Sequence, residues 1–441
     1  TSTHFLFEKR PIVDFHRGSE REEHGFHTIS AQILYPLQTL FPLCKSPFSV
    51  TSSLLKILCI DKNEYVLSEL SEGNLPFYET GLEELLQETS HNIIGYTDSY
   101  KRAVEETDAA IILVNTQLGD NGYSPEFVKS AITDIAVNLR KNPDKEYFTI
   151  ILSSTVLPGT ILKELIPLAE KISGRKYGVG FGFSYVPDFV KLGNVIEDFK
   201  NPEFFVVGAN TDKDFEITND IFNGIHENNC DKFRMTLEET EVAKVSLNAF
   251  IVNKITFANF LGMMCDEMDN VDVHKITSII GIDKRISTHF FKSGTPYGGT
   301  CFPRDALAFI KFAKDRGLKA KNLIFAEEVN EDLQEYIFNK CKEYEKVGIL
   351  GVSFKPTSPV TIGSPSKVLI EQLLKKNRYV YTYDKLEETH TNLNLPTRIC
   401  GSAQECIDNS DVVVIMHPDK SFSNLNYGDT KVIDLWGIKE K

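Results

Sequence analysis

The sequence predicts an α/β protein in which two doubly wound parallel-sheet domains are joined by a long central helix and a helical core. Toward both ends of the 441-residue chain, short apolar and β-branched runs alternate with stretches of helical periodicity. Such alternation is typical of parallel sheets that helices cover on both faces. Between the two regions, residues 237–268 hold no proline and one glycine, Gly262, and their apolar residues recur at helical spacing, which predicts one long helix.

The first α/β region opens with a strand, a turn and a helix. The apolar run at 56–60 ends in Asp61, and helical patterns follow at 64–70 and 81–87. Two further strands and the helix between them are predicted at 109–114, 147–152 and 125–139.

The long central helix carries a polar stripe. Lys244, Asn248 and Asn259 fall at helical spacing together with Ile251 and Ile255. This spacing places two amides and an ammonium on one face. Spacing alone leaves two interpretations open, a solvated face and a functional one.

The C-terminal region repeats the α/β pattern. A strand is predicted at 347–352, and Ser364-Pro365 marks the first turn of a helix that continues to about Lys376. Further strands are predicted at 379–384, 412–416 and 432–435. We therefore expect three domains, at residues 1–232, 233–330 and 331–441.

Composition and charge limit the function classes. With 41% hydrophobic and 25% charged residues, the chain has the balance of a globular protein rather than of disorder, collagen or a coiled coil. Its 48 Lys and Arg against 62 Asp and Glu give a net charge of -14, which argues against nucleic-acid binding, so an anionic ligand would need a local cationic pocket. No window of 18 apolar residues and no signal-peptide pattern occurs, so we expect a cytoplasmic protein without membrane contact.

Cys301 differs from the other cysteines. The eight cysteines include no CxxC pair and no histidine at zinc spacing, so we expect no metal site, and most should be buried apolar fillers. Cys301, however, lies in Ser293-Gly-Thr-Pro-Tyr-Gly-Gly-Thr-Cys-Phe-Pro-Arg-Asp305, where glycines and prolines allow a close approach of a ligand. Arg304, and Lys244 if the fold brings it close, would favour the thiolate of a candidate nucleophile. The alternative is a structural turn with an incidental cysteine.

The segment around Cys301 resembles the active-site signature of the nucleotide-sugar 6-dehydrogenases, the family of UDP-glucose, UDP-N-acetylhexosaminuronate and GDP-mannose dehydrogenases. Further motifs similar to those of the family follow in its order from about Lys56 to the C-terminus. They are Pro76-Phe-Tyr-Glu-Thr-Gly-Leu-Glu-Glu-Leu-Leu86, Ser153-Ser-Thr-Val-Leu-Pro-Gly-Thr160, Val186-Pro-Asp-Phe-Val-Lys-Leu-Gly193, Glu241-Val-Ala-Lys244 with Asn248, Asp283-Lys-Arg-Ile286 and Gly351-Val-Ser-Phe-Lys-Pro356. The resemblance implies that both α/β domains are Rossmann-like.

The resemblance also implies an activity, the four-electron oxidation of a sugar C6 alcohol to a carboxylate with two NAD+ in succession. Asp305, with an ordered water and Lys244, would remove the alcohol proton. Cys301 would capture the aldehyde as a thiohemiacetal and carry the later thioester, while Lys244 and Asn248 would stabilise the oxyanion. Asp188 and Thr155 would serve thioester hydrolysis.

Binding residues follow from the same resemblance. Contacts with NAD are expected from Asp61, Thr116, Thr155 and Arg304. Contacts with the nucleotide sugar are expected from Lys244, Asn248, Arg285, Lys292, Tyr297, Gly298 and Lys355, whose cations would form the pocket that an acidic protein needs. Because Arg285 matches an arginine that a neighbouring subunit donates, we expect a homodimer or a higher homo-oligomer with the long helix as its core.

The N-terminal region departs from this pattern. A dinucleotide-binding domain places a G-x-G-x-x-G loop between its first strand and helix, yet residues 35–44, where the loop should lie, hold two prolines and no glycine. Side chains at those positions would block the pyrophosphate. For the atypical residues 1–53, three explanations are open: a genuine replacement that has lost or altered cofactor binding, an error in the recorded sequence such as a shifted reading frame, and a divergent loop that binds NAD without glycines.

Smaller departures concern single residues. Asp188 stands where the family has glutamate, one methylene longer, and Arg304 stands where most members have lysine. Ile362 occupies the position of a common arginine, which leaves substrate preference or subunit geometry open.

Three functions remain to be compared. The favoured one is a nucleotide-sugar 6-dehydrogenase for a UDP-glucose or UDP-N-acetylhexosamine type of substrate. The second is a catalytically inactive sugar-nucleotide-binding homologue without a working NAD site. The third is a single-step hydroxyacid dehydrogenase that shares the three-domain plan.

Overall fold

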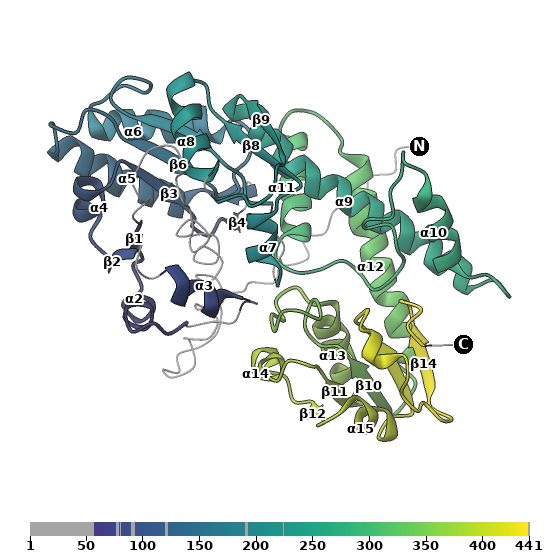
Figure 1. The fold of residues 1–441 in the computed structure, drawn as a ribbon. Helices are drawn as coiled ribbons and strands as arrows, with labels where there is room; N and C mark the ends of the chain where they lie inside the picture. The colour runs from purple at the N-terminus through teal and green to yellow at the C-terminus, as the bar shows by residue number, and fades with distance from the viewer. Residues whose placement is uncertain are drawn as a thin grey trace.

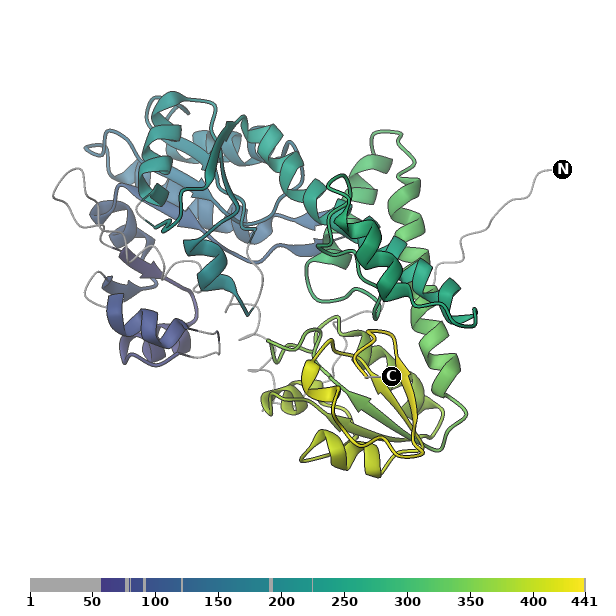
Figure 2. The same ribbon diagram turned by 45° about the vertical axis from the view of Figure 1, so that its right-hand side comes forward.

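The computed structural model describes residues 57–75, 79, 81–89, 93–119, 122–189, 193–223 and 225–439. It contains an α/β domain, a helical middle part and a second α/β domain (Figure 1). Helix α9 (Leu237–Asp266) leads from the first domain into the middle part, and α12 (Lys321–Cys341) leads from there to the second α/β domain (Figures 1 and 2). The predicted fold class is confirmed.

The described residues of the first domain contain two main sheets, one parallel and one mixed. Strands β1 (Ile57–Ile60) and β2 (Ile93–Thr97) form one. The other has the order β3-β6-β7-β8-β9, from strands Ala109–Ile112, Thr149–Leu152, Gly182–Tyr185, Phe204–Gly208 and Asp231–Met235, and only its β7–β8 pair is antiparallel. In a doubly wound dinucleotide domain with the strand order 3-2-1-4-5-6, a further strand lies between the strands that correspond to β1 and β3 of this protein. No described strand occupies that place.

Helices cover both faces of the larger sheet. Successive side chains of β6 point to opposite faces: Ile150 and Leu152 pack in a core with α5, and Ile151 packs in a second core with Phe222 of α8. The helices of this domain are α2 (Glu64–Ser71), α3 (Leu82–Thr89), α4 (Tyr100–Glu106), α5 (Glu126–Lys141), the π-helical turn η3 (Ile161–Leu165), α6 (Ile166–Ser173), α7 (Val195–Lys200) and α8 (Asp212–Asn223).

A short hairpin leaves the first domain toward the helical part. It consists of β4 (Gln117–Gly119) and β5 (Gly122–Ser124), which pair in antiparallel fashion. Strand β5 lies against α11 (Phe302–Lys314). The hairpin therefore joins two domains that are far apart in sequence.

Helix α9 begins with a capping box. The Thr236 hydroxyl accepts a hydrogen bond from the Glu239 N–H, and the Glu239 carboxylate accepts one from the Thr236 N–H. In the middle part α9 packs against α11, α12 and α10 (Val273–Ile282). Lys244 and Asn259 are buried and Asn248 is half-buried, so the polar stripe faces inward and its interpretation as a solvated face is wrong.

The C-terminal domain holds one parallel sheet with the order β12-β11-β10-β13-β14, which is a doubly wound order. Its elements are β10 (Lys346–Leu350), α13 (Pro365–Lys375), β11 (Tyr379–Tyr383), α14 (Glu388–Leu393), β12 (Arg398–Ile399), α15 (Ala403–Asp408), β13 (Val412–Ile415), the 3₁₀ turn η4 (Lys420–Phe422) and β14 (Lys431–Asp434). Ser364 caps α13 and Pro365 is its first residue, as predicted.

Some predictions concern residues that the structure does not describe. The missing glycine loop at 35–44 lies outside the described residues, and so do residues 76–78, 80 and 190–192 of two family motifs. The burial predicted for most cysteines is confirmed for Cys59, Cys265, Cys341, Cys400 and Cys406, whereas Cys301 and Cys230 are half-buried.

Candidate active site

Cys301 lies at the start of α11, in a loop that needs its glycines. The Cys301 carbonyl accepts the Asp305 N–H at 2.8 Å, so the thiol stands one helical turn before Asp305. A Cβ at Gly298 would lie 2.1 Å from the Gly363 carbonyl oxygen, and Gly299 has a φ of 78° and donates its N–H to the same oxygen at 3.0 Å. The loop thus packs backbone to backbone against the C-terminal domain.

Two asparagines hold this loop from either side. Asn259 of α9 accepts the Gly294 N–H at 2.9 Å and donates to the Thr295 carbonyl at 3.2 Å. Asn330 of α12 accepts the Tyr297 N–H at 2.8 Å and donates to the Tyr297 carbonyl at 3.1 Å. The sequence did not predict the role of Asn330, because an asparagine on a helix gives no indication of which main-chain groups it will bond.

Asp305 is the centre of a buried polar cluster. Its Oδ1 accepts hydrogen bonds from the Tyr123 hydroxyl and from Arg304 Nε, the latter at 3.1 Å. Its Oδ2 accepts one from Asn248 Nδ2 at 2.6 Å. The Asp305 side chain is about 1% exposed, so these donors offset the cost of removing its charge from water. The structure therefore brings Cys301, Asp305, Arg304 and Asn248 together, and it adds Tyr123.

Lys244 meets the segment that follows β7. Its ammonium donates to the main-chain carbonyl of Asp188 and lies 4.9 Å from the Phe189 ring centroid. Both contacts suit a protonated ammonium. Asp188, the proposed hydrolytic carboxylate, is half-buried beside this pair.

The Ser153–Thr160 motif is fixed by two contacts. Ser154 Oγ bonds both the N–H and the carbonyl of Val114, each at 2.7 Å. Glu241 of α9 accepts the Gly159 and Ile161 N–H groups at 2.7 and 2.9 Å, although burial raises the pKa of Glu241 to about 7. The motif that contains Thr155 is thus bonded to the segment after β3 and to the helix that carries Lys244.

Three of the four residues expected to contact NAD lie at one edge of the first domain. Asp61 follows β1, Thr116 follows β3 and Thr155 follows β6, at the carboxyl ends of parallel strands where doubly wound sheets bind dinucleotides. Burial raises the pKa of Asp61, whose Oδ1 accepts the Asn63 N–H at 2.7 Å. Arg304 donates to the Thr116 carbonyl at 3.3 Å and so links this edge to Asp305. A half-buried carboxylate such as Asp61, at the carboxyl end of a strand, is the kind of group that accepts hydrogen bonds from ribose hydroxyls and so fits NAD.

The residues expected to bind the nucleotide sugar are spread more widely. Tyr297 is buried and donates its hydroxyl to Glu327 at 2.5 Å, and the half-buried Lys355 lies near the Glu79 carboxylate. Lys292 is exposed. Arg285 is 87% exposed and pairs with Asp283 of its own loop, so within the described chain the structure does not bring it to Cys301.

The loop that carries Lys355 has a buried anchor. Asp384, directly after β11, accepts the Val352 and Ser353 N–H groups at 2.8 and 2.9 Å. His417 also contacts this loop, because its Nε2 forms a hydrogen bond with the Ser353 carbonyl at 2.7 Å. Neither anchor was predicted, since each acts on a segment far away in sequence.

Two features are absent from the described residues. They contain no group of three or more His, Cys, Asp or Glu side chains that could hold a metal ion. Among them, no helix combines the length and the apolar character needed to cross a membrane.

Comparison with known protein families gives matches in all three parts of the chain. Three models of the UDP-glucose/GDP-mannose dehydrogenase family match the chain: the NAD binding domain at residues 48–226, the central domain at 238–332 and the UDP binding domain at 348–438. The match to the NAD binding domain indicates NAD as the cofactor. Residues 1–47 lie outside these matches.

Individual relatives lead to the same family. The UDP-glucose 6-dehydrogenase AglM of Haloferax volcanii is 28% identical over 84% of this chain and 87% of its own length. The GDP-mannose 6-dehydrogenase of Pseudomonas putida is 28% identical over 88% and 92%. The solved structure of a UDP-glucose dehydrogenase from Pyrobaculum islandicum is 27% identical, covers 91% of both chains and superposes with a TM-score of 0.82. The chain belongs to the UDP-glucose/GDP-mannose dehydrogenase family, whose members are NAD-dependent nucleotide-sugar 6-dehydrogenases.

Proposed function

We propose that this protein oxidises the C6 alcohol of a nucleotide sugar of the UDP-glucose or UDP-N-acetylhexosamine type to the uronate, through a covalent intermediate on Cys301. The observation that carries this proposal is the placement of a half-buried thiol one helical turn before a buried carboxylate, with Asn248 bonded to that carboxylate. A single hydride transfer from a hydroxyacid to NAD would not need a thiol there.

In the first oxidation C6 loses a hydride, and side chains of the protein take up the proton of the C6 hydroxyl. NAD bound to the first domain supplies the hydride acceptor for each of the two oxidations. Asp305 takes up the hydroxyl proton through a water molecule. The Cys301 thiolate then adds to the aldehyde carbon, and the amide of Asn248 and the ammonium of Lys244 stabilise the resulting oxyanion.

In the second oxidation the thiohemiacetal becomes a thioester, which water must cleave. Asp188 lies beside Lys244, and Glu241 of α9 bonds Gly159, in the motif that contains Thr155. We propose that Asp188 accepts a proton from the attacking water and that Thr155 positions this water. The C–S bond breaks, and Cys301 leaves as the thiolate.

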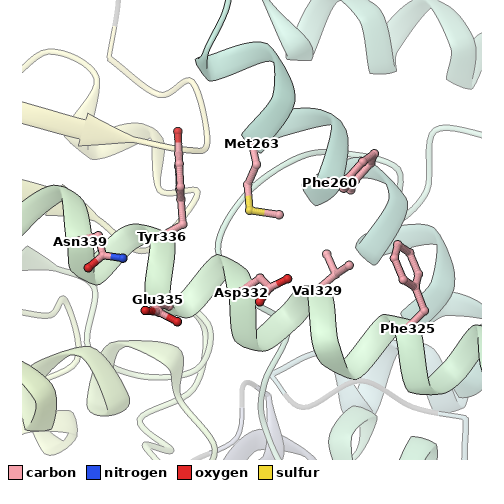
Figure 3. A pocket seen from close by; sticks show the side chains of 8 residues that line it. All are labelled: Phe260, Met263, Phe325, Val329, Asp332, Glu335, Tyr336 and Asn339. Atoms are coloured by element: carbon pink, nitrogen blue, oxygen red, sulfur yellow. The ribbon is translucent and has the colours of Figure 1, made fainter. Parts of the chain in front are cut away.

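Substrate charge is matched by Lys355 and Lys292, and by Arg285 from a second subunit. We propose a homodimer because α9 and α10 expose a large apolar face in the single chain. Phe250, Phe257 and Ile279 are 66%, 51% and 71% exposed. Between α9 and α12 lies an open cavity of about 370 Å³ with Phe260, Met263 and Phe325 in its wall (Figure 3). A second copy on this face would bury these groups.

The proposed domain limits are 1–232, 233–330 and 331–441. The three family matches fall within these limits except for residues 331–332 of the central match, and α9 starts five residues after the first limit. Expression of residues 331–441 alone is the corresponding test, because its sheet and both its cores close within that range apart from the partly buried Met263 of α9.

The experiment that tests the function is NADH formation from a panel of UDP- and GDP-sugars. We expect two NADH per sugar and a uronate product. One NADH per sugar would contradict the thioester route.

One observation favours a second candidate, an inactive sugar-nucleotide-binding homologue: residues 35–44 contain no glycine. In that case calorimetry would show binding of a UDP-sugar, no binding of NAD and no NADH formation.

A further inference from the structure

Tyr123 belongs to the first domain but lies inside the catalytic cluster. It stands on β5 of the short hairpin and is 6% exposed. Its ring packs with Val245, next to Lys244, and with Ala308 of α11, and the Arg304 guanidinium lies 5.2 Å from the ring centroid. The ring is therefore held by residues of two helices, α9 and α11, which fixes the direction of its hydroxyl.

That hydroxyl determines which lone pairs of Asp305 stay available. A carboxylate oxygen has two acceptor positions. On Oδ1 the Tyr123 hydroxyl and Arg304 Nε occupy both, whereas on Oδ2 Asn248 is the one donor among the described residues. The acceptor position of Asp305 that remains for a water molecule or a substrate hydroxyl is thus on Oδ2, next to Asn248.

Tyr123 is a permanent donor in this arrangement. Burial, followed by the charge of Asp305, raises the pKa of Tyr123 well above its ordinary value. The phenol keeps its proton at any pH near neutrality, so it cannot act as the base. Its effect must pass through Asp305.

We propose that Tyr123 is a positioning residue, whose hydroxyl occupies Oδ1 of Asp305 and so directs proton transfer to Oδ2. This inference rests on the proposed function, because Asp305 is the proton acceptor there. Tyr123 also makes the position of Asp305 depend on the hairpin of the NAD-binding domain. Neither α11 nor α9 alone would fix the carboxylate in this way.

The functional test is Tyr123→Phe, which removes one oxygen atom and keeps the ring. Losing a hydrogen bond to a charged group should lower kcat by about 10-fold or more. KM for the nucleotide sugar and for NAD should change less than about 2-fold, since the binding residues are untouched. Tyr147→Phe is the matched control, because Tyr147 donates to the buried Asp214 at 2.8 Å on the far side of the first domain. Unchanged kcat in Tyr123→Phe, or an equal loss in Tyr147→Phe, would overturn the proposal.

A second measurement does not depend on turnover. Urea unfolding of the full chain with Tyr123→Phe, Asp305→Asn and both changes gives the coupling between the two side chains. We expect Tyr123→Phe to lower the free energy of unfolding more in the wild-type background than in the Asp305→Asn background. Equal losses in the two backgrounds would contradict an interaction between the two side chains. A wild-type protein that makes no NADH but shows this coupling would refute the proposed function and leave the Tyr123–Asp305 bond established.

Discussion

The Glu241 carboxylate on α9 accepts the main-chain N–H of Gly159 at 2.7 Å, although the two residues are 82 positions apart in the sequence. The same carboxylate accepts the Ile161 N–H. One buried side chain thus connects the Ser153–Thr160 motif to the helix that carries Lys244 and Asn248.

This contact predicts a pH dependence of stability. Burial raises the pKa of Glu241 from 4.5 to about 7, so between these values the folded chain keeps a proton that the unfolded chain has released. Stability must therefore fall as pH rises through this window. From pH 5 to pH 8 the wild type should lose about 2–3 kcal/mol of unfolding free energy relative to Glu241→Gln. Urea unfolding at both pH values measures this, and parallel losses in the two proteins would contradict it.

A prediction on Cys301 separates the thioester route from a simple dehydrogenase. Cys301→Ser should form uronate more slowly by about 100-fold or more, because the serine hydroxyl is a much weaker nucleophile at neutral pH. The variant should release aldehyde or stall with a trapped covalent intermediate, which mass spectrometry and an aldehyde trap detect. Cys230→Ser, in the first domain, is the control with normal activity. Full activity of Cys301→Ser would support the hydroxyacid dehydrogenase instead.

Gly298 should not tolerate a methyl group. An added Cβ would lie 2.1 Å from the Gly363 carbonyl oxygen and 2.9 Å from Pro365 Cδ, so the loop must move. Gly298→Ala should cost about 1–3 kcal/mol of stability and displace Cys301, with a loss of activity. At Gly401 the nearest atom to an added Cβ is a side-chain oxygen of Glu405 at 3.4 Å. Gly401→Ala should therefore match the wild type in thermal unfolding and in NADH formation, and a similar result for Gly298→Ala would refute the argument.

The apolar face of α9 predicts the effect of a surface charge on assembly. Phe257 is 51% exposed in the single chain, and a glutamate in its place would have to be buried without a partner in the proposed dimer. Light scattering after gel filtration should show a monomer for Phe257→Glu. Val179→Glu changes a residue of the first domain that is 76% exposed and should leave the dimer intact. If both variants elute like the wild type, this face does not form the interface.

Most of the fold could be predicted from periodicity. A long stretch without proline predicted α9, and β-branched runs predicted β3, β6 and β13. Strand β7 was missed because Gly182-Phe-Ser-Tyr185 contains no β-branched residue, although the strand is wholly buried between its neighbours. Its strand conformation is imposed by the sheet rather than by its own residues.

The site was predictable only in part. Cys301, Asp305 and Asn248 could be found because they lie in motifs with fixed spacing. Tyr123 could not, since a tyrosine after a glycine in a connecting segment has no spacing relation to Asp305. Asn330 and Asp384 were missed because they bond the main chain of loops that are distant in the sequence. Main-chain groups are the same in every residue, so a pattern of side chains does not reveal such partners.

The contact between the Cys301 loop and the C-terminal domain also has a mechanical consequence. Gly299 donates to the Gly363 carbonyl, and an added Cβ at Gly363 would lie 2.6 Å from the Gly299 oxygen. Each backbone segment therefore occupies the space that a side chain of the other segment would need. No side chain separates the two segments at this contact, so a change of rotamer cannot accommodate a movement of one segment against the other. A movement of the C-terminal domain would therefore carry the Cys301 loop along with it, so the position of the nucleophile is coupled to the position of this domain.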